Sequence, residues 1–525
     1  MIRISNIKYP IEAPEENIIE YTARKYKISG ITDARIIKKS IDARKKDDIH
    51  YVYTIDIAAQ GERKLLKRIK NASVPKYERY RFPKGAPTEK PVIVTGFGPA
   101  GIMCAYVLAK NGYKVIVLER GKAVDERIKD VCAMRREGVL DPESNVQFGE
   151  GGAGTFSDGK LTTGTSDRRI GYVLEEFAAH GAPRDILYKA KPHIGTDKLV
   201  GTVKAFREDI ERMGGEVRFS SRLDGIETEN GRVTGAVVSR GGERYTIETD
   251  NIVLATGHSA RDTFAMLKAM GVKMERKVFA VGARIEHSQA EISRSQYGEL
   301  YKLLPAADYK LSVKTPSGRS AYTFCMCPGG EVVASASEEG GVVTNGMSEY
   351  ARDGENANSA LLVNVFPDDI EGDDVLGGIE LQRRIERRAY ELTGGYFAPA
   401  QTVGDFLYKN GAAPTVTPTY KPGVKYCSLD DVLPEFVTKT MREALPLMDK
   451  KLKGFAAEGA VLTAPETRSS SPVRILRGED GQSSIAGLYP CGEGAGYAGG
   501  IMTAAVDGIR IAEAVASNLK CKIEN

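Results

Sequence analysis

The chain has 525 residues, 42% hydrophobic and 27% charged, which is typical of a globular protein with about three domains. It contains no run of about 18 apolar residues, which excludes a membrane-spanning helix. The N-terminus lacks the apolar stretch of a secretory signal, and the seven scattered cysteines match neither a disulfide framework nor a zinc site. We therefore expect a cytoplasmic protein without a metal or a membrane partner.

The net charge of +4 is distributed unevenly along the chain. Residues 1–90 carry 21 Lys and Arg against 12 Asp and Glu, a net charge of +9, so the remainder carries −5. A basic first domain allows RNA or an acidic protein as a partner. Because no nucleic-acid motif accompanies the charge, a solvated, charge-rich small domain is the favoured interpretation.

Residues 1–88 are predicted to form an N-terminal module. Strands and helices are expected in the order strand, helix, strand, strand, helix, at 2–8, from Pro14 onward, at 32–41, at 48–58 and at 61–71. This order indicates a small, ferredoxin-like α+β module. The stretch Arg81–Lys90, which contains two prolines and a glycine, predicts a linker to the rest of the chain.

The segment 91–120 predicts a β-α-β unit that binds a dinucleotide. An apolar strand runs into a GxGxxG motif, Gly96-Phe97-Gly98-Pro99-Ala100-Gly101, which opens a helix. Gly96 permits the tight turn, Gly98 lets the backbone approach a pyrophosphate, and Gly101 lets the helix pack closely on the strand. The helix N-terminus favours phosphates. A second strand ends in Glu119, 23 positions after Gly96, whose carboxylate suits the adenosine ribose hydroxyls.

A second Gly-rich motif, GEGGAGTFSDGKL, covers residues 149–161. Five glycines within eleven positions favour backbone with positive φ or backbone that passes close to a flat ligand. Gly151 and Gly152 supply this backbone, and the hydroxyls of Thr155 and Ser157 are available to phosphate or flavin heteroatoms. The alternative interpretation is a flexible surface loop.

Later segments continue the same pattern. A helix is expected at 197–213, a strand at 216–219 and a three-stranded meander within 222–255, whose last strand runs into Ala255-Thr256-Gly257. Residues 277–455 mix strands and short helices without a dinucleotide motif. A fourth motif at 487–501 combines a buried strand, Gly492-Glu493, a Gly-rich approach at Gly499-Gly500 and a helix start at Ile501, and this helix is expected to continue to about 519.

These four motifs, in this order, resemble the glutathione-reductase-type FAD fold. More narrowly, the chain resembles a bacterial family of FAD-dependent dehydrogenases whose substrates are mostly unassigned. The phrases that carry this resemblance are GEGGAGTFSDGKL, ATGHSARDTF, FCMCPGG, ETRSSSPVRI and GEGAGYAGGI, and they span most of residues 90–525. The resemblance implies that Glu493 binds the ribityl chain, where an aspartate is commoner in the wider fold. It also implies that Leu223 holds the adenine through its backbone.

The fold class expected is therefore α/β, with a Rossmann-type FAD-binding domain and an inserted α+β substrate domain. The boundaries expected are 1–88 for the N-terminal module, 89–276 and 456–525 for the two parts of the FAD-binding domain, and 277–455 for the insertion. The residues expected to bind FAD are Gly96, Gly98, Pro99, Ala100, Gly101, Glu119, Arg120, Gly151, Gly152, Thr155, Ser157, Leu223, Ala255, Thr256, Gly257, Gly492, Glu493, Gly499, Gly500 and Ile501.

What the sequence lacks also bears on the chemistry. Only one GxGxxG occurs, so no second domain is dedicated to NAD(P)H, and no Cys-x-x-Cys or Cys-x-x-x-x-Cys pair is present. Both features depart from the disulfide reductases. No motif places a histidine for covalent attachment of the flavin. We therefore expect non-covalent FAD, with NAD(P)H as a candidate donor that docks transiently over the flavin ring.

Three weaker constellations concern catalysis. If Cys325 and Cys327 lie on a strand, both sulfurs face the same side and are candidates for a redox pair near the flavin, although two buried small residues are the favoured interpretation. Arg468, flanked by hydroxyl residues, suits bidentate recognition of an anionic substrate, with a structural ion pair in a turn as the alternative. His258 follows the Ala-Thr-Gly strand and is expected to shape a helix start near the cofactor.

The function expected is an FAD-dependent oxidoreductase acting on a small molecule. The protein would position the flavin, and the helix that begins after Gly500 would stabilise negative charge on the reduced ring. Two alternatives remain at this point: an RNA-modifying flavoprotein tethered by the basic module, and a non-catalytic flavin-binding adaptor.

Overall fold

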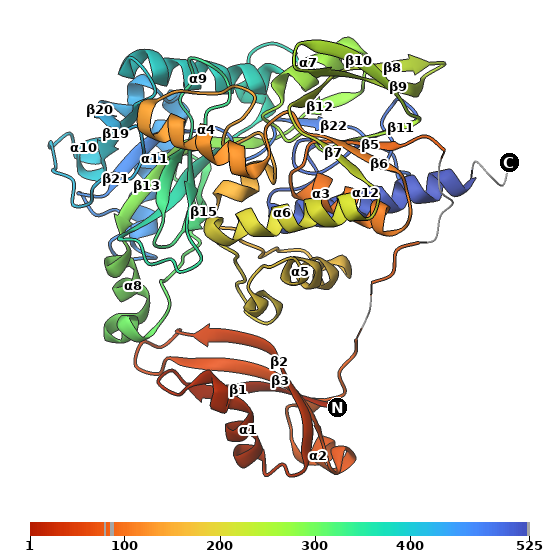
Figure 1. Ribbon diagram of the computed structural model, residues 1–525. Coiled ribbons are helices and arrows are strands. Elements are labelled where there is room, and N and C mark those ends of the chain that lie inside the picture. The colour runs from red at the N-terminus through yellow and green to blue at the C-terminus, as the bar shows by residue number, and fades with distance from the viewer. Residues whose placement is uncertain (78–79, 84–88, 522–525) are drawn as a thin grey trace.

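The N-terminal lobe of the computed structural model, whose described residues are 1–77, 80–83 and 89–521, is a four-stranded antiparallel sheet with both helices on one face (Figure 1). Its strands stand in the order β2-β3-β1-β4, and buried isoleucines of β1 and β3 pack against the helices. The elements are β1 (Ile2–Pro10), α1 (Ile18–Tyr26), β2 (Ile31–Asp42), β3 (His50–Ala59), α2 (Glu62–Arg68) and β4 (Ala72–Ser73). The predicted linker 81–90 lies partly outside the described residues.

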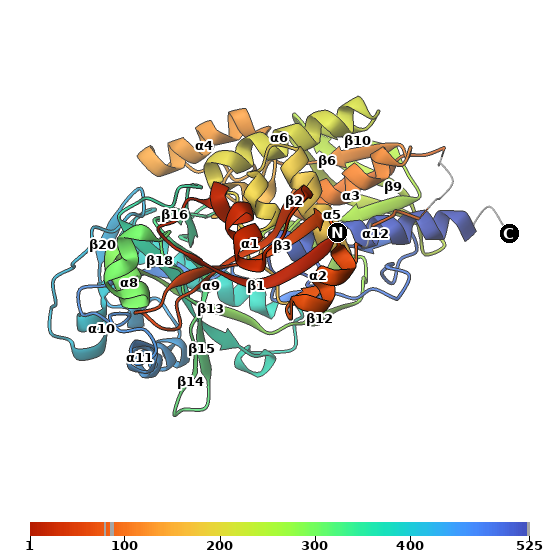
Figure 2. The same ribbon diagram turned by 90° about the horizontal axis from the view of Figure 1, so that it is seen from below.

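This lobe is attached to the rest of the chain by more than its linker. The backbone of Lys39 in β2 donates to the carbonyl of Tyr188 at 2.7 Å and accepts from the amide of Ala190 at 2.8 Å. Ile11 and Ile49 are buried in the core cluster of the large mixed domain. Figure 2, seen from below, shows the lobe lying beneath both the α5 side and the α8 side of the body.

A parallel sheet of five strands forms the second layer, in the order β23-β11-β5-β6-β7. Its strands are β5 (Val92–Thr95), β6 (Val115–Leu118), β7 (Glu216–Arg218), β11 (Asn251–Leu254) and β23 (Leu488–Pro490), and its helices include α3 (Pro99–Lys110), α4 (Val124–Glu137), α5 (Arg169–Ala179), α6 (Thr196–Arg212), α7 (Arg261–Ala269) and α12 (Ile501–Cys521). Residues Ala100–Ala109 of α3 are all buried, because α3 lies between the sheet and its neighbours α6 and α12. No described helix, α12 included, is both long and apolar enough to cross a membrane.

The expected meander is a separate three-stranded antiparallel sheet, formed by β8 (Ser221–Glu229), β9 (Arg232–Arg240) and β10 (Glu243–Glu248). Short 3-10 helices occur at Glu15–Asn17, Gly152–Phe156, Arg184–Leu187, Gly298–Leu303, Pro367–Asp369 and Leu429–Asp431. Part of the Gly-rich segment 149–161 is therefore helical, so the segment is not an irregular loop throughout.

The third unit is a seven-stranded mixed sheet in the order β14-β15-β18-β13-β21-β19-β20. Its strands are β13 (Phe279–Ser288), β14 (Ser312–Lys314), β15 (Ser320–Cys327), β18 (Asn356–Val365), β19 (Ala398–Thr402), β20 (Val424–Tyr426) and β21 (Val461–Glu466). Its helices are α8 (Gln289–Tyr297), α9 (Gly377–Thr393), α10 (Val403–Tyr408) and α11 (Glu435–Asp449). Two small antiparallel pairs accompany it, β12 (Met274–Arg276) with β22 (Val473–Ile475) and β16 (Glu331–Ala334) with β17 (Thr344–Met347).

The structure corrects one expected boundary. The insertion was expected to end at 455, yet β21 (461–466) pairs with both β13 and β19 inside the seven-stranded sheet. All six residues of β21 are buried, because both of its edges and both of its faces are covered. The chain leaves this sheet only after Glu466.

Candidate functional site

A cavity of about 790 Å³ lies where the carboxyl ends of the parallel strands face the seven-stranded sheet. One wall is formed by the residues that follow β5, β6 and β11, and the other by residues of β15 and the end of β21. A volume of this size is in the ordinary range of ligand and cofactor sites. The carboxyl edge of such a sheet is also where open α/β folds bind their ligands.

Most residues that the sequence predicted for the site meet in this cavity. Those that line it are Gly96, Gly98, Pro99, Ala100, Glu119, Arg120, Gly152, Ser157, Leu223, Ala255, Thr256, Gly257, Cys325, Arg468, Glu493, Gly499, Gly500 and Ile501. Five predicted residues do not line it: Gly101, Gly151, Thr155, Gly492 and Cys327.

These five residues support the wall from behind. A Cβ on Gly101 would lie 1.9 Å from the Gly96 carbonyl oxygen, which is the close helix packing that the motif predicted. A Cβ on Gly151 would meet the Thr155 hydroxyl at 1.9 Å, and one on Gly492 would meet the Ala100 side chain at 2.8 Å.

The prediction that Thr155 offers its hydroxyl to a ligand is corrected. Thr155 is fully buried, and its hydroxyl donates to the Glu150 carbonyl at 3.0 Å. The Ser157 hydroxyl does line the cavity, but it donates to the Gly154 carbonyl at 2.7 Å and accepts from the Gly159 amide. Both hydroxyls therefore shape the Gly-rich segment.

Arg127 holds the Gly-rich segment in place. Its guanidinium is fully buried and donates to the carbonyls of Glu150 at 2.6 Å and Gly152 at 2.9 Å, and also to those of Asn145 and Val146. Four carbonyl partners compensate the burial of the charge. The alternative of a flexible surface loop is thereby excluded.

Glu119 closes the first β-α-β unit onto the cavity. Its carboxylate accepts from the amides of Phe97 at 2.7 Å, Gly121 at 2.9 Å and Gly149 at 2.8 Å. A carboxylate offers about four lone-pair positions, so three backbone donors leave one for a ligand hydroxyl. Glu119 thus fixes three loops and still lines the cavity.

For two glycines that line the cavity, Gly98 and Gly499, neither the backbone conformation nor a neighbouring protein atom explains the absence of a side chain. Gly98 has an extended backbone with φ −79°, and a Cβ there would meet nothing closer than the Gly152 Cα at 3.8 Å. A Cβ on Gly499 would meet nothing within 4 Å. Both line the cavity, so an added side chain would occupy cavity space and nothing else. The cavity surface is therefore open where a ligand must approach the backbone closely, which fits a pyrophosphate at Gly98 and a flat ring at Gly499.

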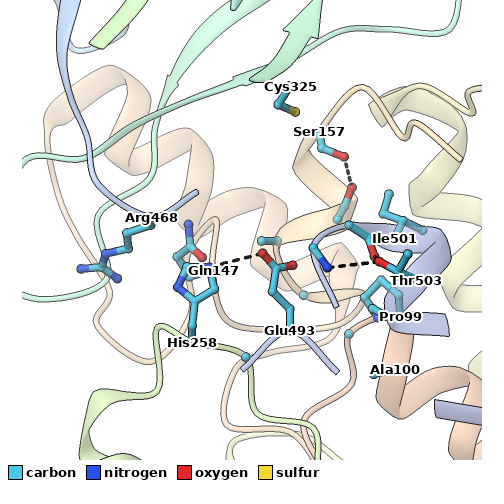
Figure 3. A pocket seen from close by; sticks show the side chains of 18 of the residues that line it. Pro99, Ala100, Gln147, Ser157, His258, Cys325, Arg468, Glu493, Ile501 and Thr503 are labelled. Atoms are coloured by element: carbon cyan, nitrogen blue, oxygen red, sulfur yellow. Dashed lines mark hydrogen bonds and ion pairs between the residues drawn. The ribbon is translucent and has the colours of Figure 1, made fainter. Parts of the chain in front are cut away.

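Glu493 stands in the middle of the cavity, with His258 on one side and Pro99, Ile501 and Thr503 on the other (Figure 3). Its side chain is 29% exposed to the cavity and accepts no hydrogen bond from the described residues; His258 Nε2 lies 3.8 Å from its Oε1. Burial raises the pKa of Glu493 to about 7, while Lys277 opposes the shift.

His258 beside it is neutral, because burial and then the charges of Arg468 and Arg261 lower its pKa to about 3. Its Nδ1 is buried without a hydrogen-bond partner among the described residues. An acid without donors and an imidazole nitrogen without a partner cost stability unless a ligand supplies the missing hydrogen bonds. They fit a ligand rich in hydroxyl groups, such as the ribityl chain of FAD.

Arg468 lines the cavity, but its guanidinium is already bound by other residues of the chain. Its Nε and Nη2 donate to the Glu386 carboxylate at 3.1 and 2.9 Å, and Nη1 donates to the Ser337 hydroxyl. Arg261 holds the same carboxylate from the other side at 2.8 and 2.9 Å. In Figure 3 the guanidinium points away from Glu493. The structure thus gives Arg468 the structural ion pair that was the alternative interpretation, and its bidentate face is not free for a substrate.

Cys325 and Cys327 lie on β15 as expected, but a β-bulge between Phe324 and Cys327 interrupts the alternation of the strand. Cys325 takes a left-handed backbone with φ 43° and faces the cavity, whereas Cys327 is buried behind it. The Cys327 thiol donates to the Cys325 carbonyl at 3.3 Å.

The sequence did not predict the charged residues around Cys325. Asp158, Lys160, Arg352 and Glu466 all line the cavity there. Asp158 and Lys160 belong to the motif GEGGAGTFSDGKL, so the motif carried a signal for them. Arg352 lies in a loop between β17 and β18 without any motif, and only the folded chain brings it to Asp158, at 2.8 and 2.6 Å.

Comparisons with known proteins agree with this organisation. Residues 90–289 match the family described as pyridine nucleotide-disulphide oxidoreductase, and residues 278–469 match the C-terminal domain of FAD-dependent proteins. Residues 1–58 match a domain of unknown function. An uncharacterized protein of Clostridium beijerinckii is 47% identical over 526 residues, which cover 98% of each chain.

Two further likenesses are partial or weak. The digeranylgeranylglycerophospholipid reductase of Methanocaldococcus jannaschii is 25% identical over 205 residues, which cover 38% of this chain and 45% of that protein. The solved structure of a geranylgeranyl bacteriochlorophyll reductase-like protein of Thermoplasma acidophilum covers 83% of this chain and 81% of its own, at 13% identity and a TM-score of 0.36. This score is too low to support an argument about the present chain.

Proposed function

We propose, on the premise that this chain belongs to the FAD-dependent oxidoreductase family that includes the Clostridium beijerinckii protein, that its cavity holds one FAD non-covalently in an extended form. The chain is an FAD-dependent oxidoreductase. The bound flavin supplies the two-electron chemistry, and the protein supplies position and electrostatics.

Each part of the cavity suits one part of this cofactor. The free lone pair of Glu119 would accept from the adenosine ribose, and Leu223 would lie against the adenine. The pyrophosphate would lie against Gly98 and the first turn of α3, where free amides and the helix dipole favour negative charge. Glu493 would accept from the ribityl chain, and the start of α12 after Gly500 would face the isoalloxazine ring.

The observation that carries the proposal is the openness of the cavity at Gly98. Gly98→Ala should leave the free energy of unfolding of the flavin-free protein unchanged within about 0.5 kcal/mol, because the new Cβ meets no protein atom within 3.4 Å. The same change should weaken FAD binding at least about tenfold, because the methyl group would occupy the space of the pyrophosphate.

The matched control is Gly201→Ala in α6, where nothing lies within 4 Å of the new Cβ and the residue does not line the cavity. Titration of flavin fluorescence against each flavin-free variant gives the two affinities. If the two variants bind FAD equally well, the pyrophosphate does not lie against Gly98 and the assignment is wrong.

The electron donor and the domain division belong to the same proposal. We infer a glutathione-reductase-type FAD domain, an inserted substrate domain that extends to Glu466, and a ferredoxin-like N-terminal module, supported by the sheet order β2-β3-β1-β4. NAD(P)H is the candidate donor, docking transiently at the cavity. Absorbance of the bound flavin after addition of NADH or NADPH tests this donor, and a flavin that neither reduces would contradict it.

A further inference from the structure

A second group of reactive side chains lines the same cavity as the residues assigned to the FAD. Cys325 faces the cavity from the bulge of β15, and Figure 3 shows its sulfur on the side of Ser157, apart from Glu493. A non-glycine residue with positive φ is strained, and such strain concentrates at functional sites. The bulge is the reason that Cys325 reaches the cavity while Cys327 remains buried directly behind it.

Positive charge surrounds the two sulfurs. Arg284 Nη2 donates to the Cys325 carbonyl at 2.6 Å and lies 3.8 Å from the Cys327 sulfur. Lys160 Nζ is buried without a hydrogen-bond partner among the described residues and lies 3.3 Å from Asp158 Oδ2. Asp158 is itself held by Arg352. The carboxylate of Asp158 is thus shared between two cations, and one positive charge is left over beside the thiols.

Glu466, the acid that pairs with Arg284, only partly cancels this excess positive charge at neutral pH. Glu466 accepts from Arg284 at 3.2 Å with both oxygens, but burial raises the pKa of Glu466 to about 7. The interaction with the Cys327 thiol, and then Lys160 and Arg284, lower the pKa of Cys325 below that of an ordinary thiol, against the effect of burial. The pKa of Cys327 is raised, mainly by its hydrogen bond with Cys325. One sulfur is therefore poised as a thiolate and the other as a thiol.

We propose that Cys325 and Cys327 form a reversible disulfide, a second redox centre that exchanges two electrons with the bound flavin, with Lys160 as the cation that stabilises the Cys325 thiolate. In the oxidation, one S–S bond forms between the two residues and the Cys327 S–H bond breaks. Two electrons and that proton pass to the oxidised flavin, and the reverse step regenerates the thiolate and the thiol. The exchange with the flavin rests on the proposed function, whereas formation of the disulfide does not.

The first test counts thiols and needs no flavin chemistry. The chain has seven cysteines, so the reduced holoprotein should take up seven maleimide labels after denaturation. After treatment with a small disulfide, bis(2-hydroxyethyl) disulfide, it should take up five, with the missing pair mapped by mass spectrometry to Cys325 and Cys327. The control variant Cys427→Ser should fall from six labels to four, whereas Cys325→Ser should stay at six. Seven labels in the treated wild type would overturn the proposal.

The second test keeps the wild-type fold. The rate of alkylation of Cys325 by iodoacetamide should reach half its maximum at a pH well below the ~8.5 of an ordinary thiol. Lys160→Gln should move this midpoint upward by about one pH unit or more, because it removes a cation whose partner, Asp158, is also shared with Arg352. A wild-type midpoint near that of an ordinary thiol contradicts the poised thiolate, and an unmoved midpoint in Lys160→Gln contradicts the role of Lys160.

The third test separates this proposal from the cofactor proposal. Holoprotein carrying the disulfide should consume four electrons per chain from dithionite without oxygen and return from five labels to seven. Two electrons, with five labels remaining, would mean that the flavin is reduced and the disulfide does not communicate with it, which overturns the exchange. A protein that binds no FAD would contradict the proposed function, and the thiol count would still decide whether the pair forms.

Discussion

Replacing Glu493 with glutamine should stabilise the protein and weaken its cofactor binding at the same time. The carboxyl has a pKa of about 7 in the folded protein and an ordinary value of 4.5, because burial disfavours its charge and the described residues donate no hydrogen bond to it. A raised folded pKa means that the cost is absent below pH 4.5, grows as the pH rises toward 7, and is constant above it. The cost is therefore about 3 kcal/mol at pH 8 and less than about 1 kcal/mol at pH 5.

The amide of Glu493→Gln carries no charge, so the flavin-free variant should gain up to about 3 kcal/mol of unfolding free energy at pH 8, and much less at pH 5. Its bond to a ribityl hydroxyl becomes a neutral one, worth about 0.5–1.5 kcal/mol instead of about 1.5–3 kcal/mol, so the FAD affinity should fall by about 1–1.5 kcal/mol, or roughly 5-fold to 13-fold. Denaturant unfolding at the two pH values and titration with FAD measure the two effects separately.

Glu176→Gln is the matched control. Burial alone would raise the pKa of Glu176, but hydrogen bonds from Lys110 and Tyr106 lower it overall, so this acid stabilises the fold above pH 4.5. The control should lose stability at pH 8 without changing FAD affinity, because Glu176 does not line the cavity. If Glu493→Gln destabilises the protein, or leaves the FAD affinity unchanged, the cavity-facing acid has been assigned incorrectly.

Three further outcomes are expected. Denaturation of the yellow protein should release FAD rather than FMN, as resolved by chromatography, because Glu119 is placed for an adenosine ribose; released FMN would contradict that placement. A chain that begins at Lys90 should keep its FAD affinity within a few-fold by titration, because the cavity is lined from Thr95 onward. Its free energy of unfolding should fall by about 1.5–3 kcal/mol for each of Ile11 and Ile49, which are buried against the large mixed domain. Loss of FAD binding would show that the module helps to build the site. Arg468→Lys should cost about 1–3 kcal/mol in denaturant unfolding, because lysine cannot hold Glu386 with two parallel bonds; a variant of unchanged stability that loses turnover would restore a substrate role.

The sequence predicted the elements of the cofactor side well because local patterns determine them. The GxGxxG turn and the buried strands β5, β6 and β11 are set by short-range apolar and glycine spacing, and the structure has them within a few residues of the expected positions. The order of the four motifs along the chain was sufficient to predict that Glu119 and Glu493 lie in one cavity. Parallel strands end at the same edge of a sheet, so residues that follow such strands must meet.

The other wall of the cavity could not be predicted in the same way. Strand β21 belongs to the seven-stranded sheet through its pairing with β13, about 180 residues earlier, and with β19, and no local pattern predicts either pairing. Arg352 reaches Asp158, and Glu386 reaches Arg468, through the same non-local folding. The interpretation of Arg468 as a substrate-binding residue failed for this reason. The hydroxyl-rich sequence around Arg468 does not indicate that Glu386, 82 residues earlier on a helix, binds its guanidinium.

Several buried polar groups in the cavity have fewer partners than the best-paired buried charges of the protein. Some buried charges are fully satisfied: Arg127 has four carbonyl partners, and Glu386 is held by two arginines. Within the cavity His258 Nδ1 and Lys160 Nζ are buried without hydrogen-bond partners among the described residues, and Glu493 accepts none. A buried polar atom without a partner costs stability, and the ones in the cavity are those that a bound ligand can reach. Their cost is recovered only when a ligand supplies the missing partners, so binding of FAD must stabilise the folded chain as well as equip it for redox chemistry.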